Sequence, residues 1–155
     1  FREIEVLDVR ELRPAIPGIR FTRVDLAAKD FPLVDYCDSL SCLHAMEHFG
    51  LGRYGDPVDY HGHLVGWENM NRMLKKGGKF YFSVPIGAQR IEFNAHRVFS
   101  VAYLLNLMDK RYDIDAFAYI NDAGDFISDA ALNEASVRSN FGCRYGCGIF
   151  VLTKR

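Results

Sequence analysis

The sequence lacks an excess of charge of either sign. It has 19 Lys or Arg and 20 Asp or Glu residues among 155, so the formal net charge is −1. No whole-chain field would draw the protein toward nucleic acid. The pair Lys75 and Lys76 is too short to form a basic patch. We therefore expect no nucleic-acid partner.

Long hydrophobic runs are also lacking. The longest mostly apolar stretch, Val98 to Met108, is interrupted by Ser100 and Asn106 and is too short to span a bilayer. We therefore expect no membrane partner. Apolar residues make up 49% and charged residues 25%, which are ordinary values for a globular protein. The length favours a single domain over residues 1–155.

Cysteine is scarce, with four residues in the whole chain. Cys37 and Cys42 fall in a strand-like apolar stretch, where reduced thiols act as small hydrophobes. We interpret the cysteines as free thiols of a reducing compartment and expect a cytoplasmic protein. Cys143 and Cys147 are four residues apart, but without a second ligand pair this spacing is weak evidence for zinc. No metal site is predicted.

Strand-like and helix-like segments alternate along the chain. Short apolar or alternating runs predict strands over 4–9, 19–26, 39–43, 79–85, 114–120 and 148–153. Apolar spacing predicts a helix over 64–74, ended by the cations and glycines of 75–78, and a second helix over 100–108. This alternation is typical of an α/β domain with a mostly parallel sheet. The last two strands lack a clear helix between them and are predicted to form an antiparallel edge.

Two short motifs match known signatures in the wrong context. The stretch His44 to His48, HAMEH, has the H-x-x-E-H pattern of zinc peptidases. It follows an apolar strand and leaves room for little more than one helical turn, whereas zinc needs both histidines on a stable helix and a third ligand. Gly50 to Gly55 has the G-x-G-x-x-G pattern, but Asp56 and Pro57 prevent a helix from starting there. We predict neither a peptidase nor a nicotinamide site.

Polar residues gather at the ends of the predicted strands. Asp8 closes the first strand, Asp25 lies near the end of the second, and His44, Glu47 and His48 follow the third. Ligands of α/β proteins bind outside the carboxyl ends of parallel strands. An acid there can accept hydrogen bonds from ribose hydroxyls, and a second acid can meet an adenine amino group. Ordinary strand-end or capping carboxylates are the alternative, which spacing alone favours.

These residues carry a resemblance to a known superfamily. Asp8 in IEVLDV, Asp25 in FTRVDL, the strand CDSLSCL with its histidine exit, and MLKKGGKFYFSVP resemble, in this order, class I S-adenosylmethionine-dependent methyltransferases. More narrowly, HAMEHFGLGRYGDP, SVPIG and FNAHRVFS resemble a domain-of-unknown-function family first catalogued in nematodes and grouped with that superfamily. The superfamily likeness extends from Ile4 onward, and the narrower one runs from Cys42 to Ser100.

The resemblance implies a Rossmann-like sheet of seven strands in the order 3-2-1-4-5-7-6, with the last strand antiparallel. The strand predicted over 4–9 would be the second of these. The first strand and its glycine-rich loop should then precede Phe1, so the domain is expected to be incomplete at its N-terminus. The resemblance also implies S-adenosylmethionine as the cofactor. By position, Asp8 would contact the ribose, Asp25 and the backbone of Leu26 the adenine, and Leu43 and His44 the methionyl part.

The resemblance does not assign catalytic residues, so these are predicted from the chemistry of methyl transfer. Methyl transfer is an in-line displacement whose acceleration comes largely from alignment. A hydroxyl acceptor also needs a base, and histidine suits neutral pH. We predict His48 as the base with Glu47 orienting it, and His44 as the alternative base. A purely structural, hydrogen-bonded role for each histidine is the other hypothesis. Arg97 either binds an anionic acceptor through two hydrogen bonds or, as we favour, anchors the loop by pairing with an acidic side chain.

The predicted function is methyl transfer to a small hydroxylated acceptor such as a sugar. The rival hypothesis is a non-catalytic domain of the same fold that serves as a binding or scaffold module.

Overall fold

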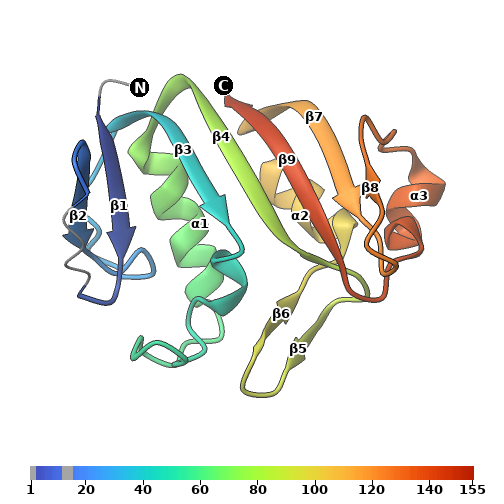
Figure 1. Cartoon of the computed structure of the whole chain (residues 1–155), viewed down its shortest axis with the longest axis horizontal. Helices are drawn as coiled ribbons and strands as arrows, with labels where there is room; N and C mark the ends of the chain where they lie inside the picture. The colour runs from blue at the N-terminus through green and yellow to red at the C-terminus, as the bar shows by residue number, and fades with distance from the viewer. Residues whose placement is uncertain (1–2, 12–15) are drawn as a thin grey trace.

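A computed structural model describes residues 3–11 and 16–155, which form strands, helices and two short 3-10 helices (Figure 1). The strands are β1 (Ile4–Asp8), β2 (Ile19–Arg23), β3 (Cys37–Leu43), β4 (Leu74–Ile86), β5 (Arg90–Glu92), β6 (His96–Val98), β7 (Tyr112–Ile120), β8 (Phe126–Ile127) and β9 (Gly146–Lys154). The helices are α1 (Gly62–Met73), α2 (Val101–Met108) and α3 (Glu134–Arg138), and the 3-10 helices are η1 (Met46–His48) and η2 (Asn140–Gly142).

The main sheet has five strands in the order β3-β4-β9-β7-β8. Strands β3 and β4 are parallel, whereas β9 is antiparallel to both of its neighbours. The prediction of a mostly parallel sheet is therefore corrected to a mixed one. To add a parallel neighbour, the chain must first cross back to the other end of the strands. The chain after β7 instead turns back through β8, α3 and η2, so β9 must run the other way. The predicted antiparallel pairing of the last two long strands is confirmed, although β9 lies inside the sheet and not at its edge.

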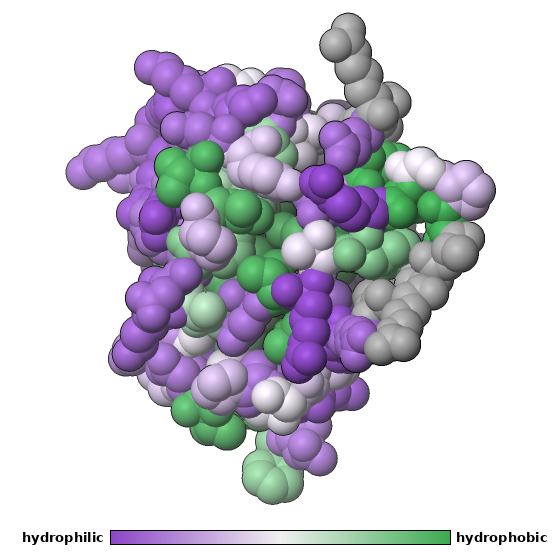
Figure 2. All heavy atoms as spheres, turned by 90° about the vertical axis from the view of Figure 1, so that its left-hand side faces the viewer, coloured by the Kyte–Doolittle hydropathy of each residue, from purple (hydrophilic) through white to green (hydrophobic). Residues whose placement is uncertain are grey.

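Strands β1 and β2 pair in parallel as a separate two-stranded sheet. Figure 1 shows this pair beside β3, and no strand of residues 3–11 and 16–155 lies between β1 and β3. The pair β2-β1 followed by β3-β4-β9-β7 reproduces the order that the resemblance implies, with the central position not filled by a described strand. Figure 2, viewed from the β2 side, shows apolar side chains in the middle of that face, framed by polar ones.

The core lies between α1, α2 and one face of the main sheet. In α1, Trp67, Met70 and Met73 recur three residues apart and are buried. The Trp67 ring lies 5.7 Å from that of Phe80 and 5.4 Å from that of Phe82, measured between ring centroids. Buried aromatic side chains of this size contribute about 1.5–3 kcal/mol each. They hold β4 in register and thereby fix where its carboxyl end lies.

Several local predictions agree with the structure only in part. The strands predicted over 39–43, 79–85 and 114–120 are present, each longer than expected. The helix ends at Met73, and 74–78 extend β4 instead of forming the last helical turn, because Leu74 pairs with Cys37 and its side chain is fully buried. The stretch HAMEH forms only one 3-10 turn, as expected. The β5–β6 hairpin and α3 were not predicted.

The four cysteines are free thiols. None of the helices that the structure describes has the length and apolar content that crossing a bilayer needs.

The carboxyl ends of the parallel strands lie on one side of the molecule. Figure 1 shows β1, β3 and β4 pointing toward its lower edge, where η1 and the β5–β6 hairpin also lie. Asp8 ends β1 and His44 follows β3, so both lie along this rim.

Candidate functional site

His44 lies directly after β3 in a left-handed backbone conformation, with φ of 51°. Its backbone N–H donates to the Ser83 carbonyl oxygen at 3.0 Å, which holds the residue at the end of the sheet. Its ring uses both nitrogens: Nδ1 is 3.1 Å from Glu47 Oε1, and Nε2 is 3.1 Å from Cys147 Sγ. These two partners, Cys147 more than Glu47, raise the pKa of His44 to about 10.

Glu47 is a buried carboxylate between two imidazoles. Its side chain is 2% exposed, and Oε1 lies 3.1 Å from His44 Nδ1 and 3.9 Å from His48 Nε2. The other oxygen, Oε2, has no hydrogen-bond partner among the described residues. A buried carboxylate is stable only beside a positive or hydrogen-bonding partner. This position therefore favours a proton on His44, whose Nδ1 is at hydrogen-bond distance.

The tautomer of His48 follows from its partner. Nδ1 lies 2.9 Å from the Ala95 carbonyl oxygen, which can only accept, so Nδ1 carries the proton. In the neutral ring, Nε2 then has the free lone pair. The ring meets those of Tyr54 and His96 edge-on, with centroids 5.4 and 6.0 Å apart. These contacts fix the ring plane and leave Nε2 as the nitrogen able to take up a proton.

Arg97 is 2% exposed and anchors the loop after η1. Its guanidinium donates to the carbonyl oxygens of Glu47 at 3.4 Å, Phe49 at 2.6 Å and Tyr60 at 3.0 Å. Burial lowers the pKa of Arg97. The anchoring role is as favoured from the sequence, but the partners are carbonyl groups and not an acid. Arg97 thereby positions η1, which carries Glu47 and His48.

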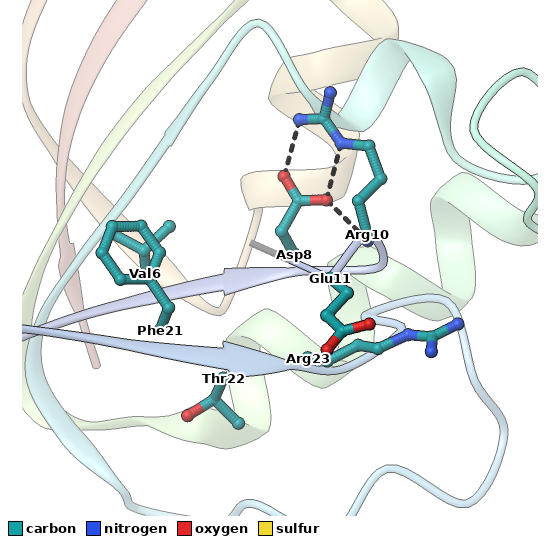
Figure 3. A pocket seen from close by; sticks show the side chains of 7 residues that line it. All are labelled: Val6, Asp8, Arg10, Glu11, Phe21, Thr22 and Arg23. Carbon is teal, nitrogen blue, oxygen red and sulfur yellow. Dashed lines mark hydrogen bonds and ion pairs between the residues drawn. The ribbon is translucent and has the colours of Figure 1, made fainter. Parts of the chain in front are cut away.

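Asp8 lines a pocket of about 200 Å³ between the carboxyl ends of β1 and β2 (Figure 3). The pocket is lined by Val6, Asp8, Arg10, Glu11, Phe21, Thr22 and Arg23. The Asp8 carboxylate accepts three hydrogen bonds from Arg10, from Nε at 2.9 Å, Nη2 at 2.8 Å and the backbone nitrogen at 2.8 Å. The side-chain bond from Arg10 is the main reason why the pKa of Asp8 is lowered.

The structure does not bring every predicted residue to this pocket. Asp25 is absent from its lining, and Asp25 Oδ1 instead accepts the Ala27 backbone N–H at 2.8 Å. The Leu26 carbonyl oxygen accepts from Asn69 Nδ2 at 2.9 Å, and Leu43 is 59% exposed. The histidines and the glutamate predicted after β3 do lie together. The roles of all these residues stay predictions.

Cys147 is the candidate that sequence reasoning missed. It lies 103 residues beyond His44, and only the insertion of β9 beside β4 brings the two together. Its four-residue spacing from Cys143 is a weak indication of zinc and gives no indication of a contact with His44. In the part of the chain that the structure describes, no group of three or more His, Cys, Asp or Glu side chains is arranged to hold a metal ion.

The chain is similar to one family and to several solved structures. A family model described as "Caenorhabditis protein of unknown function, DUF268" matches residues 6–140. No curated protein matches the chain significantly.

Among solved structures, N-methyltransferase NodS from Bradyrhizobium japonicum WM9, in complex with S-adenosyl-L-homocysteine, matches with a TM-score of 0.58 and 11% identity, over 98% of this chain and 66% of NodS. The cyclase SpnF matches with a TM-score of 0.56 and 11% identity, over 88% and 57%. A putative S-adenosylmethionine-dependent methyltransferase from Listeria monocytogenes matches with a TM-score of 0.55 and 11% identity, over 99% and 81%.

The chain thus spans less than two thirds of the length of the first two structures. At these identities the likeness shows the fold alone, and a cyclase among the matches underlines that one fold carries several chemistries.

Proposed function

This chain belongs to the DUF268 family, and we propose that it transfers a methyl group from S-adenosylmethionine to a small hydroxylated acceptor such as a sugar. Its distant structural similarity to S-adenosylmethionine-dependent methyltransferases supports the general activity. One observation carries the proposal further: Glu47, a buried carboxylate, lies between two imidazoles at the carboxyl rim of this fold.

The residues at the end of β1 fit the ribose of such a cofactor. Asp8 lines the pocket, and Arg10, which bonds to both of its carboxylate oxygens, is 55% exposed. An exposed ion pair contributes little to stability, so hydroxyl donors can replace Arg10 at low cost. Asp25 and Leu26 are proposed for the adenine.

On the methionyl side of the cofactor, we propose Leu43 and His44. When bound, the cofactor supplies an electrophilic methyl carbon on a sulfonium.

His48 is the proposed base. Nε2, with its lone pair, accepts the proton of the acceptor hydroxyl as the oxygen attacks. The imidazolium that forms faces Glu47 Oε1 at 3.9 Å, which stabilises it. His44 is less suited to this role, because both of its ring nitrogens already have side-chain partners.

Cofactor binding is tested by calorimetric titration of S-adenosyl-L-homocysteine into the full-length protein. Asp8→Ala removes hydrogen bonds to a charged group, worth about 1.5–3 kcal/mol, and should weaken binding roughly 10- to 100-fold. Asp113→Ala is the matched control, because Asp113 also pairs with an arginine, Arg155 Nε at 2.8 Å, but on β7. Absence of heat at millimolar ligand contradicts the proposal and favours the non-catalytic scaffold.

The base is tested by turnover, measured as S-adenosyl-L-homocysteine released in the presence of a panel of sugars and other hydroxylated metabolites. His48→Ala should lower turnover about 100-fold or more and leave the affinity for S-adenosyl-L-homocysteine nearly unchanged. His61→Ala, at an exposed histidine before α1, should change neither quantity. Unchanged turnover in His48→Ala would refute the base assignment while the cofactor proposal stands.

A further inference from the structure

Cys147 holds a fixed position at the rim. It is the second residue of β9 and pairs with Pro85 of β4 on one side and Ile120 of β7 on the other. Its side chain is partly buried, and Sγ lies 3.1 Å from His44 Nε2. Because β9 is paired on both sides, the backbone at Cys147 is fixed. The contact between its thiol and His44 therefore depends on how the sheet is paired.

The contact continues through the imidazole to a carboxylate. Cys147 Sγ meets His44 Nε2, and His44 Nδ1 meets Glu47 Oε1, each at 3.1 Å. This order of thiol, imidazole and acid is that of an activated nucleophile, its base and the group that orients the base. The His44 side chain is 48% exposed, so a small molecule can approach this end of the sheet.

The burial of Glu47 supports the same arrangement. It is 2% exposed, and Oε2 has no hydrogen-bond partner in the described ranges. A carboxylate kept in such a place calls for a cation beside it, and His44, with its pKa raised to about 10, is the nearest group that can become one. An imidazole held beside sulfur, with a carboxylate behind it, is the arrangement found around activated cysteine nucleophiles.

We propose that Cys147, His44 and Glu47 form a nucleophilic triad that makes Cys147 a reaction site for small molecules with an electrophilic carbon bearing a leaving group. In the reactive form of the pair, the proton shared by the two side chains lies on His44 Nε2. In the step itself, a bond forms between Sγ and the carbon. The bond to the leaving group breaks, and that group departs with the bonding electrons. This site goes beyond methyl transfer to an external hydroxyl, which needs no thiol.

Alkylation by iodoacetamide tests the triad without any methyl donor, so its outcome is separate from that of the proposed function. The four cysteines are followed individually by mass spectrometry of their peptides at about pH 6.5, where an ordinary thiol is about 1% ionised. Cys147 should react fastest. Cys37 is the internal reference, because it is also partly buried but burial raises its pKa.

Variants separate activation from exposure. Asn tolerates the left-handed backbone at position 44, and His44→Asn should slow alkylation of Cys147 roughly fivefold, because the imidazole that contacts the thiol is removed. Glu47→Gln keeps the side-chain shape and should slow it by a smaller factor. His61→Asn is the matched control with no expected effect. The triad is refuted if Cys147 reacts no faster than Cys37, or at the same rate in wild type and in both triad variants.

Discussion

Replacing the buried Arg97 by methionine should destabilise the protein more than most single changes. Its guanidinium is the donor for the carbonyl oxygens of Glu47, Phe49 and Tyr60. In Arg97→Met these carbonyls lose that donor while the apolar part of the side chain is kept. The change therefore isolates the polar role of the arginine.

The expected magnitude follows from these three contacts. A buried polar group left without its partner costs about 1–3 kcal/mol. Two of the three bonds to Arg97 are 3.0 Å or shorter, and the third, to Glu47, is longer at 3.4 Å. Methionine also removes the cost of burying a charge, and Arg97 Nε itself lacks a partner among the described residues. The net loss in the free energy of unfolding should be about 3 kcal/mol.

Urea unfolding with linear extrapolation measures this loss. Arg53→Met is the matched control, because Arg53 also donates to a carbonyl oxygen, that of Ala95 at 3.0 Å, but on the exposed surface. No measurable change is expected there. A loss below about 1 kcal/mol in Arg97→Met, or an equal loss in Arg53→Met, would show that Arg97 does not anchor the loop.

Three further results are expected. His63 is 5% exposed, and burial lowers its pKa from 6.5 to about 4. Its contribution to stability is fully present above pH 6.5 and is lost as pH falls toward 4, so the free energy of unfolding should drop by about 3 kcal/mol in that window. Equally steep pH dependence in wild type and His63→Leu would contradict this. Gly87→Ala places a Cβ 2.3 Å from the Arg144 carbonyl oxygen and should cost about 1–3 kcal/mol in urea unfolding, whereas an unchanged midpoint would mean that the backbone yields freely. Ser100→Ala removes the side chain that accepts the Tyr103 N–H at the start of α2 and should cost about 1 kcal/mol by the same assay; a change near zero would rule out the cap.

The elements predicted correctly are those that residues close in sequence determine. The apolar run over 79–85 lies in β4, and Ser100 caps α2 where its helix was expected to begin. The end of α1 was misjudged because 75–78 have the composition of a helix stop. Pairing of Leu74 with Cys37, a contact between distant segments, decides instead that strand begins there.

In the candidate site, too, the residues close in sequence were predicted and the contact between distant residues was not. His44, Glu47 and His48 were found together because they are neighbours along the chain. Cys147 was missed because its contact with His44 depends on where β9 enters the sheet, and no pattern near Cys147 records that choice. Asp25 was placed by analogy with a strand end, but its carboxylate accepts the N–H of a local turn.

We propose that the rim at the end of β1 holds the nucleoside of S-adenosylmethionine. A crystal structure of the full-length protein with S-adenosyl-L-homocysteine tests it most directly. We expect ribose hydroxyls within hydrogen-bond distance of the Asp8 carboxylate, with the Arg10 side chain displaced. A ligand bound elsewhere, with the ion pair between Asp8 and Arg10 intact, would contradict it.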